Sequence, residues 1–87
     1  MFNPGNLVYC GKKQGIDVFI YNGVRIDAAM TDTRDGRYLY VGFGQGYGIS
    51  SQEMVGLLNW FGIDRSQFYD EHEFPDKSFY LVQRKAA

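Results

Sequence analysis

Residues 42–48 alternate glycine with larger side chains, in the order Gly-Phe-Gly-Gln-Gly-Tyr-Gly, directly before an expected helix. Backbone N–H groups in such a loop can bind phosphate, because the helix dipole favours an anion at the helix N-terminus. The glycine spacing matches neither the dinucleotide-binding G-x-G-x-x-G pattern nor a Walker A motif, and Glu53 in the first helical turn would repel an anion. The pattern therefore favours a strand-to-helix connection that presents Phe43, Gln45 and Tyr47 outward over a phosphate site.

His72 and Cys10 are the other residues that could do chemistry, and the chain has one of each type. His72 lies among Asp70, Glu71 and Glu73, whose oxygens could ligate a metal ion. A metal needs several converging ligands, which neighbouring loop residues seldom provide, so we interpret this segment as a solvated acidic turn. Cys10 ends an apolar run, where burial would raise the pKa of its thiol and remove its reactivity. A Cys10–His72 pair stays open as an alternative, but we expect no enzyme, no metal site and no cofactor.

Aromatic residues alternate along the segment 37–43. The positions that resemble the aromatic strand of RNA-recognition motifs are Tyr38, Tyr40, Val41 and Phe43. Gly36, Arg37 and Leu39 depart from that pattern, and the family needs a helix between its first two strands, where this chain has only strands and turns. The chain is therefore not assigned to that family. Alternating aromatics also pack on one face of a strand, whereas exposed rings beside glycines can stack nucleic-acid bases.

Composition narrows the range of partners. The 87 residues form one domain, because a second hydrophobic core would not fit, and the net charge is −1. This charge lacks the basic excess of a general nucleic-acid-binding protein and is too weak for a DNA mimic. The basic residues at 12–13 and 84–85 are interpreted as a solvated turn and a solvated tail. Seven Tyr and seven Phe exceed what a small core can hold, so some rings are expected at an interface.

Cysteine content and hydropathy bear on location. A single cysteine leaves no intramolecular disulfide, which favours a reducing compartment. No signal peptide is recognised at the N-terminus, and no run approaches the roughly 18 apolar residues that cross a bilayer. We therefore expect a cytoplasmic location and no membrane partner.

Turn residues divide the first half of the chain into strands. Asn22-Gly23 between two apolar runs is a strong hairpin signal, because a type I′ turn needs positive φ at both positions. Polar loops are expected at residues 11–15 and 31–36, and an irregular acidic segment at 63–74. The expected strands are residues 7–10, 16–21, 24–30, 37–43 and 78–83. Because the first three connections are short, consecutive strands must pair antiparallel as a meander.

One helix is marked at both ends. Ser50 and Glu53 match the capping box, and Gly62 is a natural stop. The apolar stripe consists of Met54, Leu57, Leu58 and Phe61. The expected fold is α+β: an antiparallel β-meander of four to five strands with one helix, at about residues 51–61, packed on one face. Residues 1–87 are expected to form a single compact domain.

The resulting functional hypothesis is a small non-enzymatic protein that binds a partner protein and blocks it sterically. In size and in its lack of catalytic groups the chain resembles the small inhibitors that phages encode against host machinery, anti-CRISPR proteins among them. The expected partner-binding residues are Phe43, Gln45, Tyr47, Tyr38 and Tyr40, with Asp70, Glu71 and Glu73 as a rim. The alternative is a single-stranded nucleic-acid-binding module that uses the same aromatics. Exposed rings and unpaired strand edges also leave a homodimer open.

Overall fold

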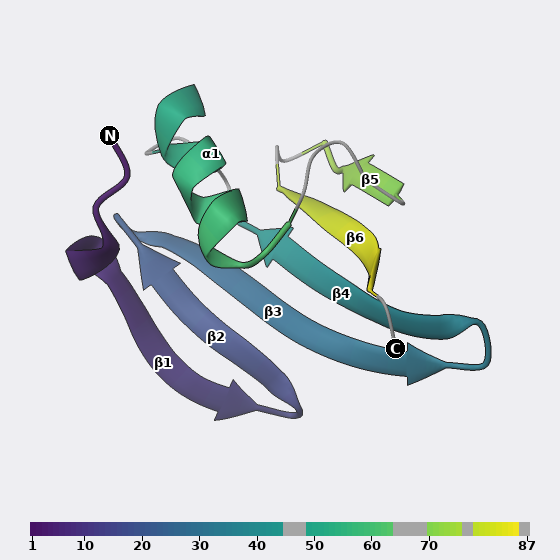
Figure 1. The fold of residues 1–87 in the computed structure, drawn as a ribbon. Coiled ribbons are helices and arrows are strands. Elements are labelled where there is room, and N and C mark those ends of the chain that lie inside the picture. The colour runs from purple at the N-terminus through teal and green to yellow at the C-terminus, as the bar shows by residue number, and fades with distance from the viewer. Residues whose placement is uncertain (45–48, 64–69, 76–77, 86–87) are drawn as a thin grey trace.

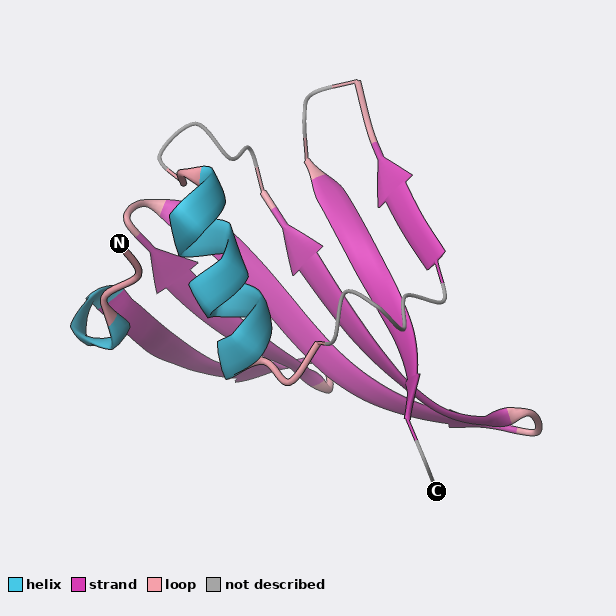
Figure 2. Cartoon of the chain, turned by 45° about the horizontal axis from the view of Figure 1, so that its top comes forward, coloured by secondary structure: helices cyan, strands magenta, loops and turns pink. Residues whose placement is uncertain are grey.

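The computed structural model describes residues 1–44, 49–63, 70–75 and 78–85. Its strands form one antiparallel sheet in the order β1-β2-β3-β4-β6-β5, and helix α1 lies on one face of this sheet (Figure 1, Figure 2). The elements, in chain order, are η1 (Pro4–Asn6), β1 (Leu7–Lys13), β2 (Ile16–Tyr21), β3 (Val24–Thr33), β4 (Gly36–Phe43), α1 (Ser51–Trp60), β5 (Asp70–Glu73) and β6 (Phe79–Lys85). The predicted α+β meander with one helix on one face is confirmed.

The hairpin turns are tighter than predicted. Asn22 and Gly23 have φ values of 48° and 82°, as the type I′ prediction requires. Gln14 and Gly15, at 54° and 81°, form an equivalent turn, so β1 continues to Lys13 where a five-residue loop was expected. β3 likewise continues to Thr33. Both loops were predicted too long, because polar residues at the ends of β1 and β3 also pair with the neighbouring strands.

The C-terminal part of the sheet differs most from the prediction. Residues 70–73, expected in an irregular acidic turn, form strand β5, which pairs antiparallel with β6. Acidic residues have low strand propensity, so the free edge of β6 determines this structure. Arg84 and Lys85, expected in a tail, belong to β6, which pairs with β4. β6 therefore lies inside the sheet, between β4 and β5.

The helix begins and ends as the sequence predicts. The Ser50 side chain accepts a hydrogen bond from the Glu53 backbone at 3.2 Å, and the Glu53 carboxylate accepts one from the Ser50 backbone at 3.3 Å. At the other end Gly62 has a φ of 75°, and the Ile63 N–H donates to the Leu58 carbonyl at 2.8 Å. This 6→1 bond is the hallmark of a Schellman motif, which satisfies a carbonyl that the helix leaves free.

The core lies between α1 and the sheet. Leu57 and Leu58 of the predicted stripe are buried, and Met54 and Phe61 pack against the core at its margin. β3 and β4 contribute alternate residues, as period-2 geometry requires, whereas β2 buries Val18 and Tyr21. The sheet residues of the core cluster are Tyr21, Ile26, Ala28, Leu39, Val41, Phe43 and Leu81.

Glu53 also fastens α1 to the β2–β3 turn. The buried Tyr21 hydroxyl donates to the Glu53 carboxylate at 2.7 Å, and the Asn22 amide donates to the same oxygen at 3.2 Å. The hydrogen bond from Tyr21, and then those from Ser50, hold the pKa of Glu53 below its usual range. The ionised Glu53 carboxylate thus links the N-terminus of α1 to the end of β2 and to the β2–β3 turn.

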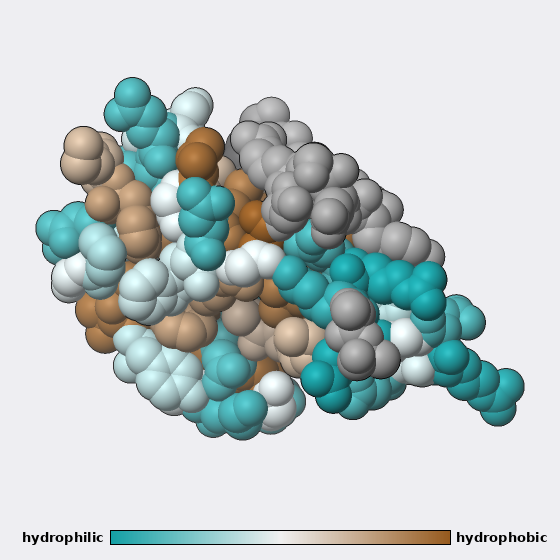
Figure 3. Space-filling model, in the orientation of Figure 1, coloured by the Kyte–Doolittle hydropathy of each residue, from teal (hydrophilic) through white to brown (hydrophobic). Residues whose placement is uncertain are grey.

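The N-terminal segment covers part of the helix. The Phe2 ring lies 5.4 Å from that of Tyr21 and 6.2 Å from that of Trp60. A Cβ on Gly56 would lie 2.3 Å from the Phe2 Cβ, so only glycine permits this approach. Figure 3 shows apolar residues gathered around the helix, whereas the tip of the β3–β4 hairpin is hydrophilic.

Candidate functional site

Side chains that alternate with the core residues point to the other side of the sheet, which we call the open face. No helix among the described residues lies on it. Strand register defines its members: Gly42 pairs with Asp27 of β3 on one side and with Tyr80 of β6 on the other. The open-face residues of β3, β4 and β6 include Arg25, Asp27, Ala29, Thr31, Tyr38, Tyr40, Gly42, Tyr80, Val82 and Arg84.

Three aromatic rings gather on the open face. The ring centroids of Tyr40 and Tyr80 lie 5.1 Å apart, and those of Tyr80 and Phe74 lie 5.9 Å apart. These separations are typical of favourable aromatic pairs. Phe74, just after β5, remains 43% exposed. We call Tyr40, Phe74 and Tyr80 the aromatic cluster.

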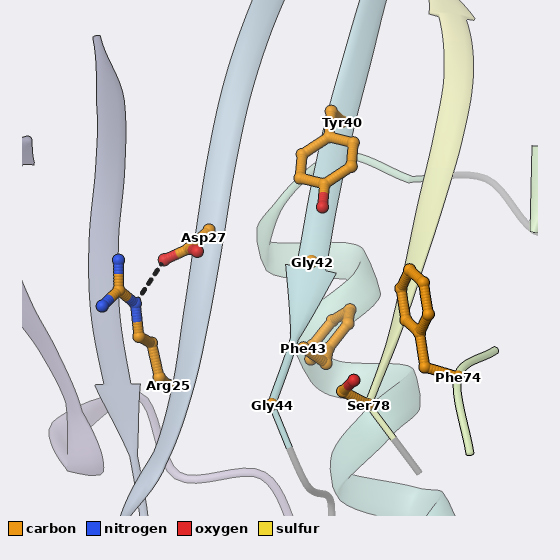
Figure 4. Close-up of a pocket in the computed structure, with 8 residues that line it drawn as sticks. All are labelled: Arg25, Asp27, Tyr40, Gly42, Phe43, Gly44, Phe74 and Ser78. Atoms are coloured by element: carbon orange, nitrogen blue, oxygen red, sulfur yellow. Dashed lines mark hydrogen bonds and ion pairs between the residues drawn. The ribbon is translucent and has the colours of Figure 1, made fainter. Parts of the chain in front are cut away.

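Gly42 makes room for the cluster. The Tyr40 side chain lies over it, so that a Cβ at this position would be 2.9 Å from the Tyr40 hydroxyl oxygen and 3.2 Å from its ring. Figure 4 shows the Tyr40 hydroxyl directed along β4 towards Gly42. Glycine at position 42 therefore leaves room for an aromatic neighbour, whereas a flexible connection was predicted there.

A cavity of about 180 Å³ lies beside the cluster. Arg25 and Asp27 border it on one side and Phe74 on the other, with Tyr40 between them (Figure 4). Gly42 and Gly44 line it without side chains, and the Gly44 N–H donates to the Arg25 carbonyl at 2.8 Å. This cavity is open to solvent and partly polar, and its volume is close to the roughly 150 Å³ of an enclosed apolar cavity that binds benzene, which is the size of one aromatic ring.

The cavity's charges are paired. The Arg25 Nε lies 2.9 Å from an Asp27 carboxylate oxygen, with both side chains partly exposed. Burial, and then the charge of Asp27 and the nearby Tyr80, raise the pKa of Tyr40. The Tyr40 hydroxyl therefore stays protonated at neutral pH, and it can still exchange hydrogen bonds with a ligand.

The predicted binding residues separate into several groups. Tyr38 and Tyr40 lie on the open face, partly buried. Phe43 borders the cavity but is only 3% exposed and packs with the core, so the prediction that it points outward is wrong. Its odd-numbered position places it on the same face as Leu39 and Val41, which α1 covers. Gln45 and Tyr47 lie outside the described residues.

The acidic rim occupies the edge of the sheet. Asp70, Glu71 and Glu73 belong to β5, where Asp70 pairs with Val82 and Glu73 with Phe79. Their backbone therefore runs beside β6, one strand beyond the one that carries Tyr80. The partner-binding role of these residues stays a prediction.

The proposed Cys10–His72 pair is excluded by topology. Cys10 belongs to β1 and His72 to β5, which form opposite edges of a six-stranded sheet. Neighbouring strands are about 4.8 Å apart, so five steps separate the two residues by more than 20 Å. Cys10 is also exposed, which corrects the expectation that it is buried. In the described part of the chain, no three His, Cys, Asp or Glu side chains gather as metal ligands.

Sequence reasoning missed Phe74, Tyr80, Arg25 and Asp27. The available signal was period-2 alternation in the strands that contain Arg25, Asp27 and Tyr80. Using it requires knowing that β6 pairs with β4, which places Tyr80 opposite Gly42.

Two further findings concern membrane-spanning helices and similarity to known proteins. Within the described residues, none of the helices has the length and apolar character needed to cross a bilayer. Comparison with protein-family models, with curated proteins and with solved structures found no match for this chain.

Proposed function

We propose that this protein is a non-enzymatic binding protein that recognises a partner protein through the open face. The observation that supports this proposal is the aromatic cluster beside a ring-sized cavity, on a sheet face that no helix of the described residues covers. Tyr and Phe are enriched in the central parts of protein interfaces, where their large rings provide most of the buried apolar area. A partner seated on this face would be blocked by steric occlusion.

Charge favours a protein over single-stranded nucleic acid as the partner. Alternating Tyr38 and Tyr40 could stack bases, which is the reason to keep this alternative. Such binding also needs cations that can reach phosphates. The two arginines of the open face already have acceptors: Arg25 pairs with Asp27, and Arg84 donates to the Asp35 carbonyl. Among the described residues of β3, β4 and β6, the open face therefore offers rings beside arginines that already have acceptors.

Inhibition of the partner and a cytoplasmic location are proposed from the sequence. Inhibition of the partner, of the kind carried out by small phage proteins, follows from the resemblance in size and type. A cytoplasmic location follows from the single cysteine. Self-association is a further outcome that the same experiment distinguishes.

The test is affinity capture from a lysate of the encoding organism, with and without nuclease, followed by purification of the captured protein. Binding of that purified protein is then measured by calorimetry with wild type, with Tyr40→Ala/Tyr80→Ala, and with Tyr9→Ala. Tyr9 is a matched control because it is a 55% exposed tyrosine on β1, outside the cluster.

We expect wild type and Tyr9→Ala to bind equally, and the double variant to bind at least about tenfold more weakly, as for a loss of central aromatic contacts. Equal binding by all three proteins would overturn the proposal. Capture that disappears with nuclease, or affinity that falls steeply with salt, would favour nucleic acid. If the only protein captured is a further copy of this chain, the result would favour a homodimer.

A further inference from the structure

We propose that the cavity on the open face accepts a single phenol ring, the side chain of a tyrosine, from the partner protein. This inference rests on the proposed function, since it names the chemistry by which that partner is recognised. Three features lie around this one small cavity: the aromatic cluster, the glycines Gly42 and Gly44, and the Arg25–Asp27 ion pair. Their arrangement points to the phenol ring.

Size selects one ring. The volume of about 180 Å³ is only slightly above the roughly 150 Å³ that holds benzene, and below the roughly 300 Å³ at which small-molecule pockets begin. Gly42 and Gly44 present backbone alone to this space. The Tyr40 side chain already lies over Gly42, so a guest ring would pack against Tyr40 there, and Gly44 adds no side chain that would narrow the space.

The walls favour an aromatic guest. Phe74 and Tyr40 border the cavity, and Tyr80 lies against both of them within the cluster. Aromatic pairs contribute about 0.5–1.5 kcal/mol beyond the apolar area that they bury. Phe74 is 43% exposed, so a ring docked here would cover apolar surface that now faces water.

The ion pair disfavours a charged guest. A cationic side chain would compete with Arg25 for Asp27, and an acidic side chain would compete with Asp27 for Arg25, at a modest cost because both side chains are partly exposed. A phenol hydroxyl avoids both costs, because it is neutral and can donate one hydrogen bond and accept another. The pair supplies both matching groups, a carboxylate acceptor and guanidinium donors.

The test is an NMR titration of the intact protein with side-chain analogues. The probes are p-cresol for tyrosine, toluene as the ring without a hydroxyl, and n-propylguanidinium for arginine. We expect p-cresol to shift the amide signals of Gly42, Gly44 and Asp27 with a millimolar dissociation constant, and toluene to bind about tenfold more weakly for want of the hydrogen bond.

Two variants locate the site. Phe74→Ala removes one wall and should weaken p-cresol binding at least threefold, whereas Trp60→Ala, which removes a 55% exposed ring on α1, should leave it unchanged. Dispersed amide spectra and thermal melts verify that both variants fold. If Phe74→Ala does not fold, Phe74→Leu takes its place.

Several results would overturn the inference. These are the absence of shifts at the three amides with p-cresol, tighter binding of n-propylguanidinium than of p-cresol, and equal binding of toluene. Shifts of the same amides by a thymidine oligonucleotide that weaken steeply with salt would overturn both the inference and the proposed function. Phenol binding without any effect of Tyr40→Ala/Tyr80→Ala on a captured partner would leave the cavity's preference for a phenol ring standing, but would overturn the proposed function and the partner as the source of that ring.

Discussion

The two faces of the sheet are made by alternate residues of the same strands, yet they differ in chemistry. On the covered face Ala28, Val41 and Leu81 form one row across β3, β4 and β6, and each is at most 8% exposed. On the open face the next row is Asp27, Gly42 and Tyr80. The covered row is aliphatic, whereas the open row combines a charge, a glycine and an aromatic ring.

If the open face binds a partner as proposed, this difference assigns stability to one face and binding to the other. Burial of apolar area is the main stabilising contribution to folding, and α1 provides it on the covered face. The open face keeps its rings partly exposed and its charges paired, so its side chains can change with small cost to the fold. Variants that contrast the two faces should therefore give different phenotypes.

The largest effect is expected from two phenylalanines on opposite sides of the sheet. Phe43→Ala removes a ring that is 3% exposed and should destabilise the protein by about 3–5 kcal/mol. Phe74→Ala removes a ring that is 43% exposed and should lower the free energy of unfolding by about 1 kcal/mol, because this ring buries less apolar area than Phe43 does. Urea denaturation of both variants measures the contrast. Similar losses would show that the open face contributes to stability as the covered face does.

A smaller effect is expected at the helix, where Gly56 contacts Phe2. Gly56→Ala raises helix propensity but forces Phe2 away from Tyr21 and Trp60, with a net loss of about 1 kcal/mol. In a Phe2→Ala background the same change should stabilise the protein, because the clash is gone. Thermal unfolding of wild type, the two single variants and the double variant gives the coupling free energy between positions 2 and 56. Additive effects would mean that Phe2 does not pack on the helix in solution.

The larger pH-dependent effect is expected at Glu53, where α1 meets the β2–β3 turn. The pKa of Glu53 is lowered in the folded state, so its contribution to stability is complete above its ordinary pKa and is lost as pH falls through the lowered value. Stability should therefore fall in acid, and Glu53→Gln should flatten that fall. Denaturant midpoints between neutral pH and about pH 3 measure it. Asp32→Asn is the matched control, because Arg37 lowers the pKa of Asp32 at the exposed β3–β4 hairpin, where the gain from pairing is smaller.

The smallest effect on stability is expected at Gly42 on the open face. In Gly42→Ala the new methyl group meets the end of the Tyr40 side chain, which can rotate away at a cost below about 1 kcal/mol. Ring contacts between Tyr40 and Tyr80, followed by NMR, should weaken, and binding of p-cresol should change. Unchanged ring contacts together with a large loss of stability would mean that Tyr40 has no alternative position.

Local signals predicted the first four strands and the helix well. Asn22-Gly23 and the Ser50–Glu53 capping box depend on only a few neighbouring residues, and both have the predicted geometry. β5 was missed because its residues, Asp70–Glu73, favour turns, and pairing with β6 alone makes them a strand.

The candidate site was harder to predict because it depends on distant parts of the chain. The alternation of Tyr38 with Tyr40 and the odd-numbered position of Phe43 were visible, but they do not say which face α1 covers. Once the helix lies over Leu39 and Val41, Phe43 must be buried and Tyr40 must be on the other side. Phe74 and Tyr80 join Tyr40 through the pairing of β4 with β6, which no local pattern specifies.

The interior position of β6 has a consequence for how the chain folds. β1 to β4 pair with their sequence neighbours, so this meander can form from local contacts. β4 obtains its second partner only when residues 79–85 reach residues 37–43, and the intervening chain must first be closed into a loop. We therefore expect the meander to form early and the insertion of β6 to limit the folding rate. Until β6 arrives, β4 is an exposed edge, and the open face exists only in part.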